Sequence, residues 1–226
     1  MVQLVLVRHG ESTANFDNTY TGWSDVELTD HGREQAHVAG RLIAASHIDF
    51  DAVHTSMLRR AIMTAYIIQD ELHANWLPIT KSWRLNERHY GALRGLNKDK
   101  TRTLFGPQQV AQWRRSYTAE PPHLARAHHQ RRYAAWPTSI IPTGESLADA
   151  SARLLPYWND HVVPALRADH NQLIVAHGST LRALIKHLEG IADADIDGVE
   201  VGNAAPIVYT LDERLAIADK TILTTE

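Results

Sequence analysis

Two histidines each follow a short apolar run and precede a glycine. Leu4–Val7 leads into Arg8-His9-Gly10, and Leu173–Val175 leads into Ala176-His177-Gly178. Continuous apolar runs of this kind are typical of strands buried in a parallel sheet, and ligands bind at the carboxyl edge of such sheets. A glycine after each histidine lets the backbone approach a ligand closely. A single buried histidine is more often a core residue with satisfied hydrogen bonds, but the matched pair favours a shared site.

The residues around these histidines favour a phosphate ligand over a metal ion. Neither histidine stands in an HxH or HExxH spacing, and arginine beside a metal ligand would repel the cation. Arg8, Arg59 and Arg60 can instead grip a phosphate through paired hydrogen bonds. Neighbouring cations also lower the pKa of a histidine, which keeps the imidazole neutral and able to attack phosphorus. We therefore expect His9 to carry a phosphoryl group without the help of a metal.

The middle of the chain is strongly basic. Lys81 to Arg132 holds twelve Lys and Arg but only three acids, a net +9, within a chain whose formal charge is −3. Such a segment indicates an anionic ligand, although a solvated basic face is the plainer interpretation. Glu87 lies inside it and could give a proton to, or take one from, a substrate oxygen. The alternative for Glu87 is a surface ion pair with Arg88.

Strand-like and helix-like segments alternate along the chain. Thr29 is a candidate N-cap for a helix that continues to about Ala45, and Ser146 with Asp149 forms a capping-box pattern for a helix to about Val163. Alternation with continuous apolar strands predicts an α/β fold with three layers, a mainly parallel central sheet carrying helices on both faces. The remaining expected elements are strands at 50–54 and 207–211 and helices at 57–72 and 180–188.

The length of 226 residues suits one α/β domain over residues 1–226. The stretch at about 82–142 contains five prolines and few apolar residues, so we expect an irregular, lid-like insertion. The absence of cysteine excludes thiol catalysis and disulfides and fits a reducing compartment. No apolar run approaches the ~20 residues of a membrane span. We expect a soluble, cytoplasmic protein that contacts neither membrane nor nucleic acid.

Arg8-His9-Gly10-Glu11-Ser12 matches the signature of the histidine phosphatase superfamily. Within it, the chain resembles the cofactor-dependent phosphoglycerate mutases over nearly all its length. The short signature is only moderately specific, whereas the longer stretches together are highly specific. Those stretches are Thr21–Trp23, Thr55–Ile62, Leu85–Gly91, Gly95–Lys98, Gln112–Arg115, and Ala176–Gly178 with Leu181–Leu184.

The resemblance implies the phosphoglycerate mutase-like fold and the interconversion of 2- and 3-phosphoglycerate, in glycolysis and gluconeogenesis. His9 would be the phosphorylated nucleophile, Glu87 the proton donor and acceptor, and His177 a stabiliser of the transferred group. A primer, 2,3-bisphosphoglycerate, is implied, with a small phosphorylated three-carbon acid as substrate, no metal, and a homodimer or homotetramer. The implied binding residues are Arg8, Ser12, Thr13, Asn15, Thr21, Gly22, Arg60, Arg88, Tyr90, Lys98, Arg114, Arg115, Gly178 and Ser179.

Some positions depart from the family pattern. Ser179 stands where the family has Asn, Ala14 where it has a bulky residue, and the sequence ends at Glu226 without the family's long tail. We therefore expect a larger share of hydrolysis beside mutase activity. The main alternative is a broad-specificity or bisphosphoglycerate phosphatase of the same superfamily, which would not need Lys98 or the pair Arg114-Arg115. A non-catalytic phosphate-binding protein would need neither His9 nor Glu87, and a nucleic-acid binder could use the basic middle segment.

Overall fold

A single six-stranded sheet organises the protein, whose computed structural model describes residues 1–225. The strand order is β3-β2-β4-β1-β5-β6, in which β1 to β4 are parallel, β5 is antiparallel to β1, and β6 is antiparallel to β5. The expected mainly parallel α/β sheet is therefore confirmed. The strands are β1 (Val2–Arg8), β2 (Ala52–Thr55), β3 (Ile79–Lys81), β4 (Gln172–Ala176), β5 (Ile207–Leu211) and β6 (Ile217–Ile222).

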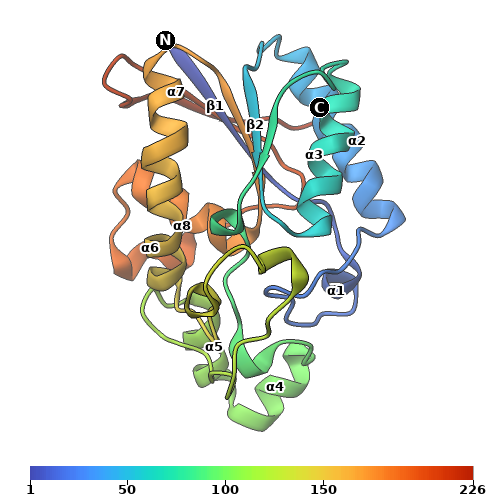
Figure 1. Cartoon of the computed structure of the whole chain (residues 1–226), viewed down its shortest axis with the longest axis vertical. Helices are drawn as coiled ribbons and strands as arrows, with labels where there is room; N and C mark the ends of the chain where they lie inside the picture. Colours follow the sequence, from blue (N-terminus) through green and yellow to red (C-terminus); the bar gives the residue numbers. More distant parts are fainter. Residues whose placement is uncertain (226) are drawn as a thin grey trace.

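Helices cover both faces of the sheet (Figure 1). Alternate residues of β1 separate two cores: Leu4 and Leu6 pack with α6, α7 and α8, whereas Val5 and Val7 pack with α2 and α3. This double burial explains why β1 reads as a continuous apolar run, since both faces of the strand are covered. The helices are α1 (Thr13–Phe16), α2 (Asp30–Ala45), α3 (Arg59–Glu71), α4 (Lys98–Phe105), α5 (Pro107–Arg115), α6 (Leu147–Tyr157), α7 (Val163–Arg167) and α8 (Gly178–Glu189).

Local capping fixes where the two long expected helices begin. The Thr29 hydroxyl accepts a hydrogen bond from the Gly32 amide, and Ser146 forms the expected capping box with Asp149. The helix expected to reach Val163 instead ends at Tyr157 and continues as a π-helical turn, Trp158–Val162, into α7. Pro164 accounts for this change of register, because it has no N–H for a regular α-helical bond to the carbonyl four residues earlier.

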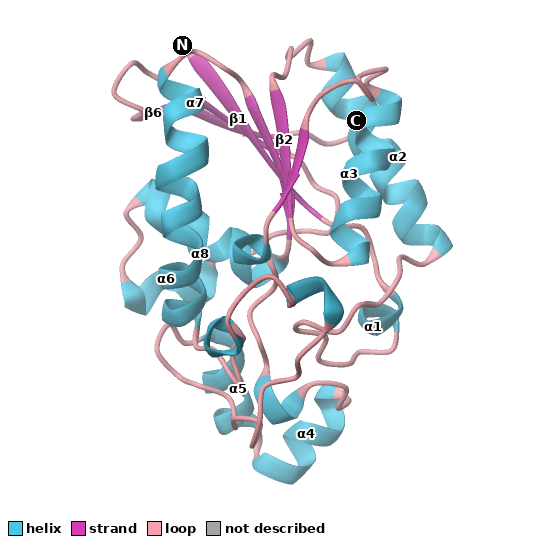
Figure 2. Cartoon of the chain, in the orientation of Figure 1, coloured by secondary structure: helices cyan, strands magenta, loops and turns pink. Residues whose placement is uncertain are grey.

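The stretch at 82–142 is not irregular throughout, contrary to our expectation. It carries α4 and α5 together with 3₁₀ turns, and it lies at the end of the sheet opposite the N-terminus (Figure 2). Asn97 caps α4 by accepting from two amides, and Pro107 opens α5. Each helix buries one residue, Thr101 and Val110, so neither shows the apolar periodicity that would reveal it in the sequence. The 3₁₀ turns of the chain are Trp83–Leu85, Gly91–Leu93, Arg131–Tyr133, Thr138–Ile140 and Asp193–Gly198.

None of the helices formed by residues 1–225 has the length and apolar character required to traverse a bilayer.

Candidate active site

The two histidines singled out in the sequence lie next to each other. β1 and β4 are paired neighbours with Arg8 opposite Ala176, so His9 and His177 leave the sheet side by side, with ring centroids 5.1 Å apart. A Cβ on Gly10 would come within 2.0 Å of a backbone oxygen of Gly32, so only glycine fits there. The expectation that matched strand ends bring the two rings together therefore agrees with the geometry.

Hydrogen bonds to His9 define which of its ring nitrogens carries the proton. Nδ1 lies 2.7 Å from the Gly10 carbonyl oxygen, which can only accept, so Nδ1 is the protonated nitrogen. Arg60 Nε donates to His9 Nε2 at 3.2 Å, so Nε2 holds the lone pair. Burial, followed by the charges of Arg60 and Arg8, keeps the pKa of His9 well below its usual value. His9 is thus a neutral imidazole with Nε2 available as a nucleophile.

His177 is fully buried behind His9. Its Nε2 lies 2.8 Å from the Ser56 hydroxyl, while its Nδ1 has no hydrogen-bond partner within residues 1–225. Burial, and then the charge of Arg60, lowers the pKa of His177 well below the usual range. An unpaired buried polar atom is costly, so Nδ1 is a natural partner for an atom of a bound ligand.

Arg60 and Arg8 bring positive charge to the two histidines. Arg60 also donates from Nη1 to the Ser24 carbonyl at 2.8 Å and from Nη2 to the Gly22 carbonyl at 2.9 Å, which fixes the guanidinium beside His9. Burial lowers the pKa of Arg60 to about 10, so it remains charged at neutral pH. Arg8 donates to the Val201 carbonyl at 2.8 Å, and its Nε has no partner among the described residues.

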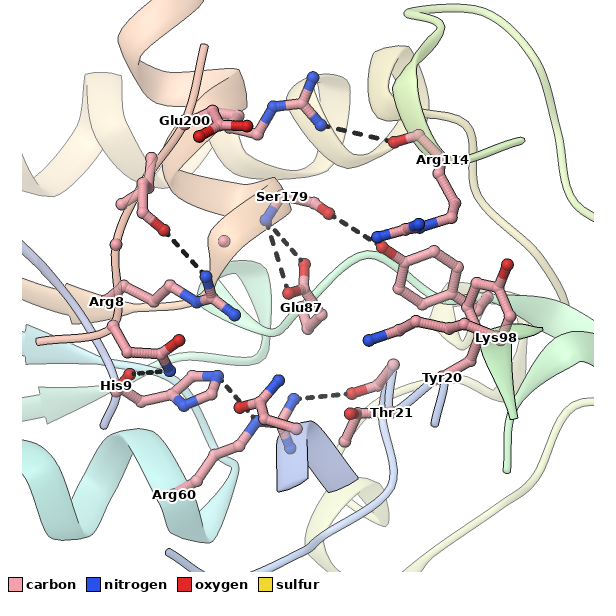
Figure 3. A pocket seen from close by; sticks show the side chains of 18 of the residues that line it. Arg8, His9, Tyr20, Thr21, Arg60, Glu87, Lys98, Arg114, Ser179 and Glu200 are labelled. Atoms are coloured by element: carbon pink, nitrogen blue, oxygen red, sulfur yellow. Dashed lines mark hydrogen bonds between the residues drawn. The ribbon is translucent and has the colours of Figure 1, made fainter. Parts of the chain in front are cut away.

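Glu87 faces the same opening as these groups (Figure 3). Its carboxylate accepts from the Ser179 amide at 3.1 Å and from the Arg88 amide at 2.8 Å. The Ser179 amide belongs to the first turn of α8, where unpaired N–H groups and the helix dipole favour negative charge. Glu87 is thus held by backbone amides, with its carboxylate directed at the cavity that contains His9.

The cavity between these groups has a volume of about 350 Å³, and cations form its far wall. Lys98 extends into it from the side opposite Arg8 and His9 (Figure 3), and burial lowers the Lys98 pKa. Arg88 lies behind the wall, fully buried under the Tyr90 ring, with its guanidinium carbon 4.7 Å from the ring centroid. A cavity lined on two sides by cations suits a ligand with anionic groups at both ends.

Most of the site residues expected from the sequence line this cavity. Four do not: His177 lies behind His9, Arg88 lies behind Tyr90, Ser12 caps α1, and the Thr13 amide bonds to Glu27. The expected residues that line it are Arg8, His9, Asn15, Thr21, Gly22, Arg60, Glu87, Tyr90, Lys98, Arg114, Arg115, Gly178 and Ser179.

The cavity wall also includes residues that were not predicted as site residues, namely Thr19, Tyr20, Arg182 and the loop 199–203. The loop reaches His9 through Asn203, whose side-chain amide donates to the His9 carbonyl at 2.9 Å. The next residue, Ala204, has a left-handed backbone with φ of 48° and donates its amide to the Arg8 carbonyl at 2.9 Å. These contacts are made to backbone carbonyls, so no residue pattern would have disclosed them.

Comparisons with known proteins agree with this geometry. The model of the histidine phosphatase superfamily (branch 1) matches residues 4–219. The chain is 61% identical to 2,3-bisphosphoglycerate-dependent phosphoglycerate mutase 1 of Latilactobacillus sakei subsp. sakei (strain 23K), over 97% of this chain and 94% of that protein. It is 54% identical to 2,3-bisphosphoglycerate-dependent phosphoglycerate mutase 2 of Lactobacillus johnsonii (strain CNCM I-12250 / La1 / NCC 533), over 99% and 98% respectively. The solved mycobacterial glucosyl-3-phosphoglycerate phosphatase with VO3 is similar at 27% identity and a TM-score of 0.74, over 93% of each chain.

Proposed function

Because the chain belongs to the histidine phosphatase superfamily, and within it to the 2,3-bisphosphoglycerate-dependent phosphoglycerate mutases, we propose how its site interconverts 2- and 3-phosphoglycerate. One observation carries the proposal: the buried, neutral His9 and the Glu87 carboxylate open onto the same cationic cavity. A nucleophile and a proton-transfer group on one cavity are what phosphoryl transfer to and from a hydroxyl requires.

In the first half of the reaction, His9 Nε2 attacks the phosphorus of the primer. The N–P bond forms as the P–O bond to the glycerate carbon chain breaks, and Glu87, which enters this step as the carboxylic acid, gives its proton to the departing oxygen and becomes the carboxylate. Arg60 Nε must then release Nε2, and it remains next to the oxygens of the phosphoryl group. In the second half, Glu87 takes the proton of the accepting hydroxyl while that oxygen attacks the phosphohistidine. This step regenerates 2,3-bisphosphoglycerate, and the isomer that is released depends on which of its two phosphates His9 removes.

The cations around the cavity supply the charge neutralisation in this proposal. Arg8 Nε and His177 Nδ1 are buried without a partner in residues 1–225, and phosphoryl oxygens would satisfy both. Lys98, Arg114 and Arg115 lie on the wall where the carboxylate and second phosphate of a bisphosphate would bind. With these groups in place, positioning and charge stabilisation suffice and no metal ion is needed.

The cellular setting of the enzyme is also part of the proposal. We infer a cytoplasmic homodimer or homotetramer whose ligands are small phosphorylated three-carbon acids, with 2,3-bisphosphoglycerate as the primer, named in the mutases to which the chain is similar.

A coupled assay with 3-phosphoglycerate, with and without 2,3-bisphosphoglycerate, tests this function. We expect turnover that depends on the primer and a phosphoenzyme that is acid-labile and alkali-stable, as a phosphoramidate is. His9→Ala should abolish both, whereas His170→Ala, an exposed histidine outside the cavity, should retain both. Primer-independent release of phosphate without isomerisation would show a phosphatase instead, and label that survives acid would exclude His9 as the carrier.

A further inference from the structure

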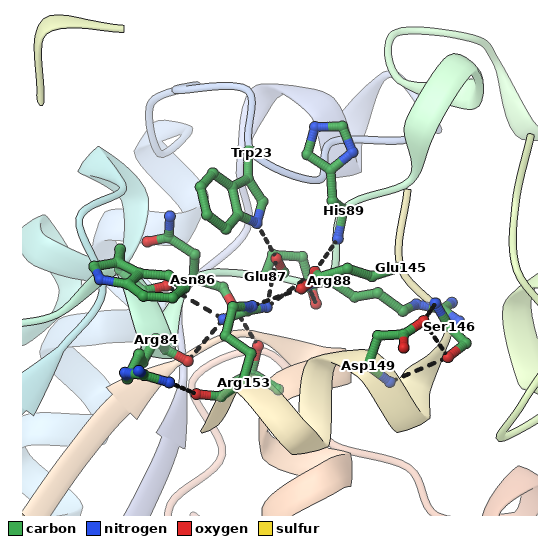
Figure 4. A network of polar contacts seen from close by, with 12 residues as sticks. Trp23, Arg84, Asn86, Glu87, Arg88, His89, Glu145, Ser146, Asp149 and Arg153 are labelled. Carbon is green, nitrogen blue, oxygen red and sulfur yellow. Dashed lines mark hydrogen bonds and ion pairs between the residues drawn. The ribbon is translucent and has the colours of Figure 1, made fainter. Parts of the chain in front are cut away.

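A buried ion pair lies next to the active site but outside its cavity. Arg153 of α6 and Glu145, just before that helix, have side chains only 6% and 5% exposed, and Arg153 Nε lies 2.6 Å from Glu145 Oε1 (Figure 4). Neither residue lines the cavity. A buried ion pair contributes little net stability, because desolvation offsets the attraction between the charges. The role of this pair therefore depends on the backbone groups to which it hydrogen-bonds.

Arg153 holds the backbone that leads into Glu87. Its Nη1 donates to the carbonyls of Trp83 and Arg84 at 3.2 and 2.7 Å. Its Nη2 donates to the carbonyls of Asn86 and Glu87 at 3.1 and 3.3 Å. The segment 83–87 therefore wraps around one guanidinium, whose rigid planar fork fixes several carbonyls at once.

Glu145 holds the same backbone from the other side of Glu87. Its Oε2 accepts from the His89 amide at 2.8 Å, and the Glu145 amide donates to the His89 carbonyl at 2.8 Å. Trp23 adds a third support, because its Nε1 donates to the Glu87 carbonyl at 2.6 Å. The peptides immediately before and after Glu87 are thus both anchored to the ion pair.

The Glu87 side chain has few restraints of its own. Its carboxylate accepts only from the backbone amides of Arg88 and Ser179 among the described residues. One of these amides belongs to the held segment itself, so the position of the carboxylate follows the path of the backbone. Since misplacing a reacting group by about 1 Å can cost roughly 10²-fold in rate, this path matters for proton transfer.

We propose that Arg153 and Glu145 are positioning residues that aim the Glu87 carboxyl at the substrate oxygen. This inference rests on the proposed role of Glu87 as the proton donor and acceptor. It assigns the pair no contact with substrate and no part in forming the bond between His9 and phosphorus. The pair should therefore matter when the leaving oxygen needs a proton and be dispensable when it does not.

Two phosphoryl donors separate these cases. With 2,3-bisphosphoglycerate the leaving alkoxide needs the proton of Glu87, whereas 4-nitrophenyl phosphate releases a phenolate that needs none. The measurement is the first-turnover phosphorylation of His9 by each donor, followed by rapid quench or by the burst of 4-nitrophenolate. For Arg153→Lys, which keeps the charge but loses the fork, we expect about a 10²-fold slower reaction with the bisphosphate. The burst with the aryl donor should stay within about threefold of wild type, and KM should change little.

Arg84→Lys is the matched control. Arg84 lies in the same segment and its side chain donates to the Arg153 carbonyl at 2.9 Å, but within residues 1–225 it forms no hydrogen bond with the 87–89 backbone. It should leave both reactions unchanged. Glu145→Gln, which preserves shape but removes the charge, provides a milder second variant if Arg153→Lys does not fold. It should show the same donor selectivity with a smaller loss.

Equal losses with both donors would show that the pair only supports the shape of the site and would overturn the proposal. Unchanged rates with both donors in folded Arg153→Lys and Glu145→Gln would overturn it as well. Failure of the proposed function has a separate signature, because wild-type protein would then not become phosphorylated on His9 by 2,3-bisphosphoglycerate at all.

Discussion

Acid should unfold this protein because several of its histidines are buried in the neutral form. His9, His89 and His177 are each at most 3% exposed, and burial is the largest cause of their lowered pKa values. For His89, burial together with the charges of Arg94 and Arg153 lowers the pKa from 6.5 to about 4. The perturbation to apply is a fall in pH from 7 to 5.

The direction in which pH changes the free energy of unfolding depends on whether the folded or the unfolded state binds the proton. Above pH 6.5 a histidine is neutral in both states and contributes nothing to the pH dependence. Between pH 6.5 and the lowered folded pKa, only the unfolded chain binds the proton, so the free energy of unfolding falls by about 1.4 kcal/mol per pH unit for each histidine. His89 alone should cost about 3 kcal/mol by pH 4. His9 and His177, whose pKa values are also lowered well below the usual value, decrease the free energy of unfolding in the same direction as the pH falls.

Urea unfolding at a fixed protein concentration, at pH values from 7.5 to 5.0, measures this slope. Near pH 5.5 we expect a slope steeper than the about 1.4 kcal/mol per pH unit that a single histidine such as His89 contributes. His89→Asn removes one titrating group while retaining an acceptor for the Gly91 amide, which now bonds to His89 Nδ1 at 3.0 Å. Its slope should be lower by about 1.4 kcal/mol per pH unit. A wild-type slope below about 1.5 kcal/mol per pH unit, or an unchanged slope in His89→Asn, would refute the reasoning.

Further measurements test other parts of the structure. Glu87→Gln should lower kcat by roughly 10²–10⁴-fold with little change in KM, and a variant within twofold of wild type would make Glu87 structural. Excess EDTA should leave turnover unchanged, and a loss restored by Mn²⁺ or Mg²⁺ would point to a metal mechanism. Ala204→Gly should raise the free energy of unfolding by about 0.5–1 kcal/mol, because glycine relieves a left-handed backbone, and a destabilised variant would contradict this. Ser179→Asn has a longer side chain to hold the phosphoryl group and should lower the rate of phosphate release relative to isomerisation. The same ratio of these two rates in the variant and the wild type would show that Ser179 does not cause the hydrolysis.

The central strands and the approach of His9 to His177 could be predicted because their signals are local. β1 contains the apolar run 4–7 and β4 the apolar run 173–176, and the residues that follow these strands in sequence must meet at one edge of a parallel sheet. The helix starts at Thr29 and Ser146 were equally visible, since an N-cap is recognised from the cap and the following turn.

The elements that were missed lack such a local signal. β6 is an edge strand whose residues are almost all exposed, so it shows no alternation of apolar and polar residues. α4 and α5 depend on their caps and bury one residue each, which leaves no apolar stripe. The loop 199–203 approaches Arg8 and His9 partly through backbone groups, and every residue has those groups.

The reactivity of the site and the acid sensitivity of the fold have a common origin. The buried arginines and the low-dielectric surroundings that keep His9 neutral and nucleophilic also prevent it from binding a proton in the folded state. Within residues 1–225 the buried side-chain polar atoms without a hydrogen-bond partner all belong to Arg8, Arg88, His177 and Arg182, around this one cavity. Each such atom costs about 1–3 kcal/mol unless a ligand oxygen satisfies it. A phosphate that accepts a hydrogen bond from Arg8 should therefore raise the free energy of unfolding, so ligand affinity and fold stability depend partly on the same side chains.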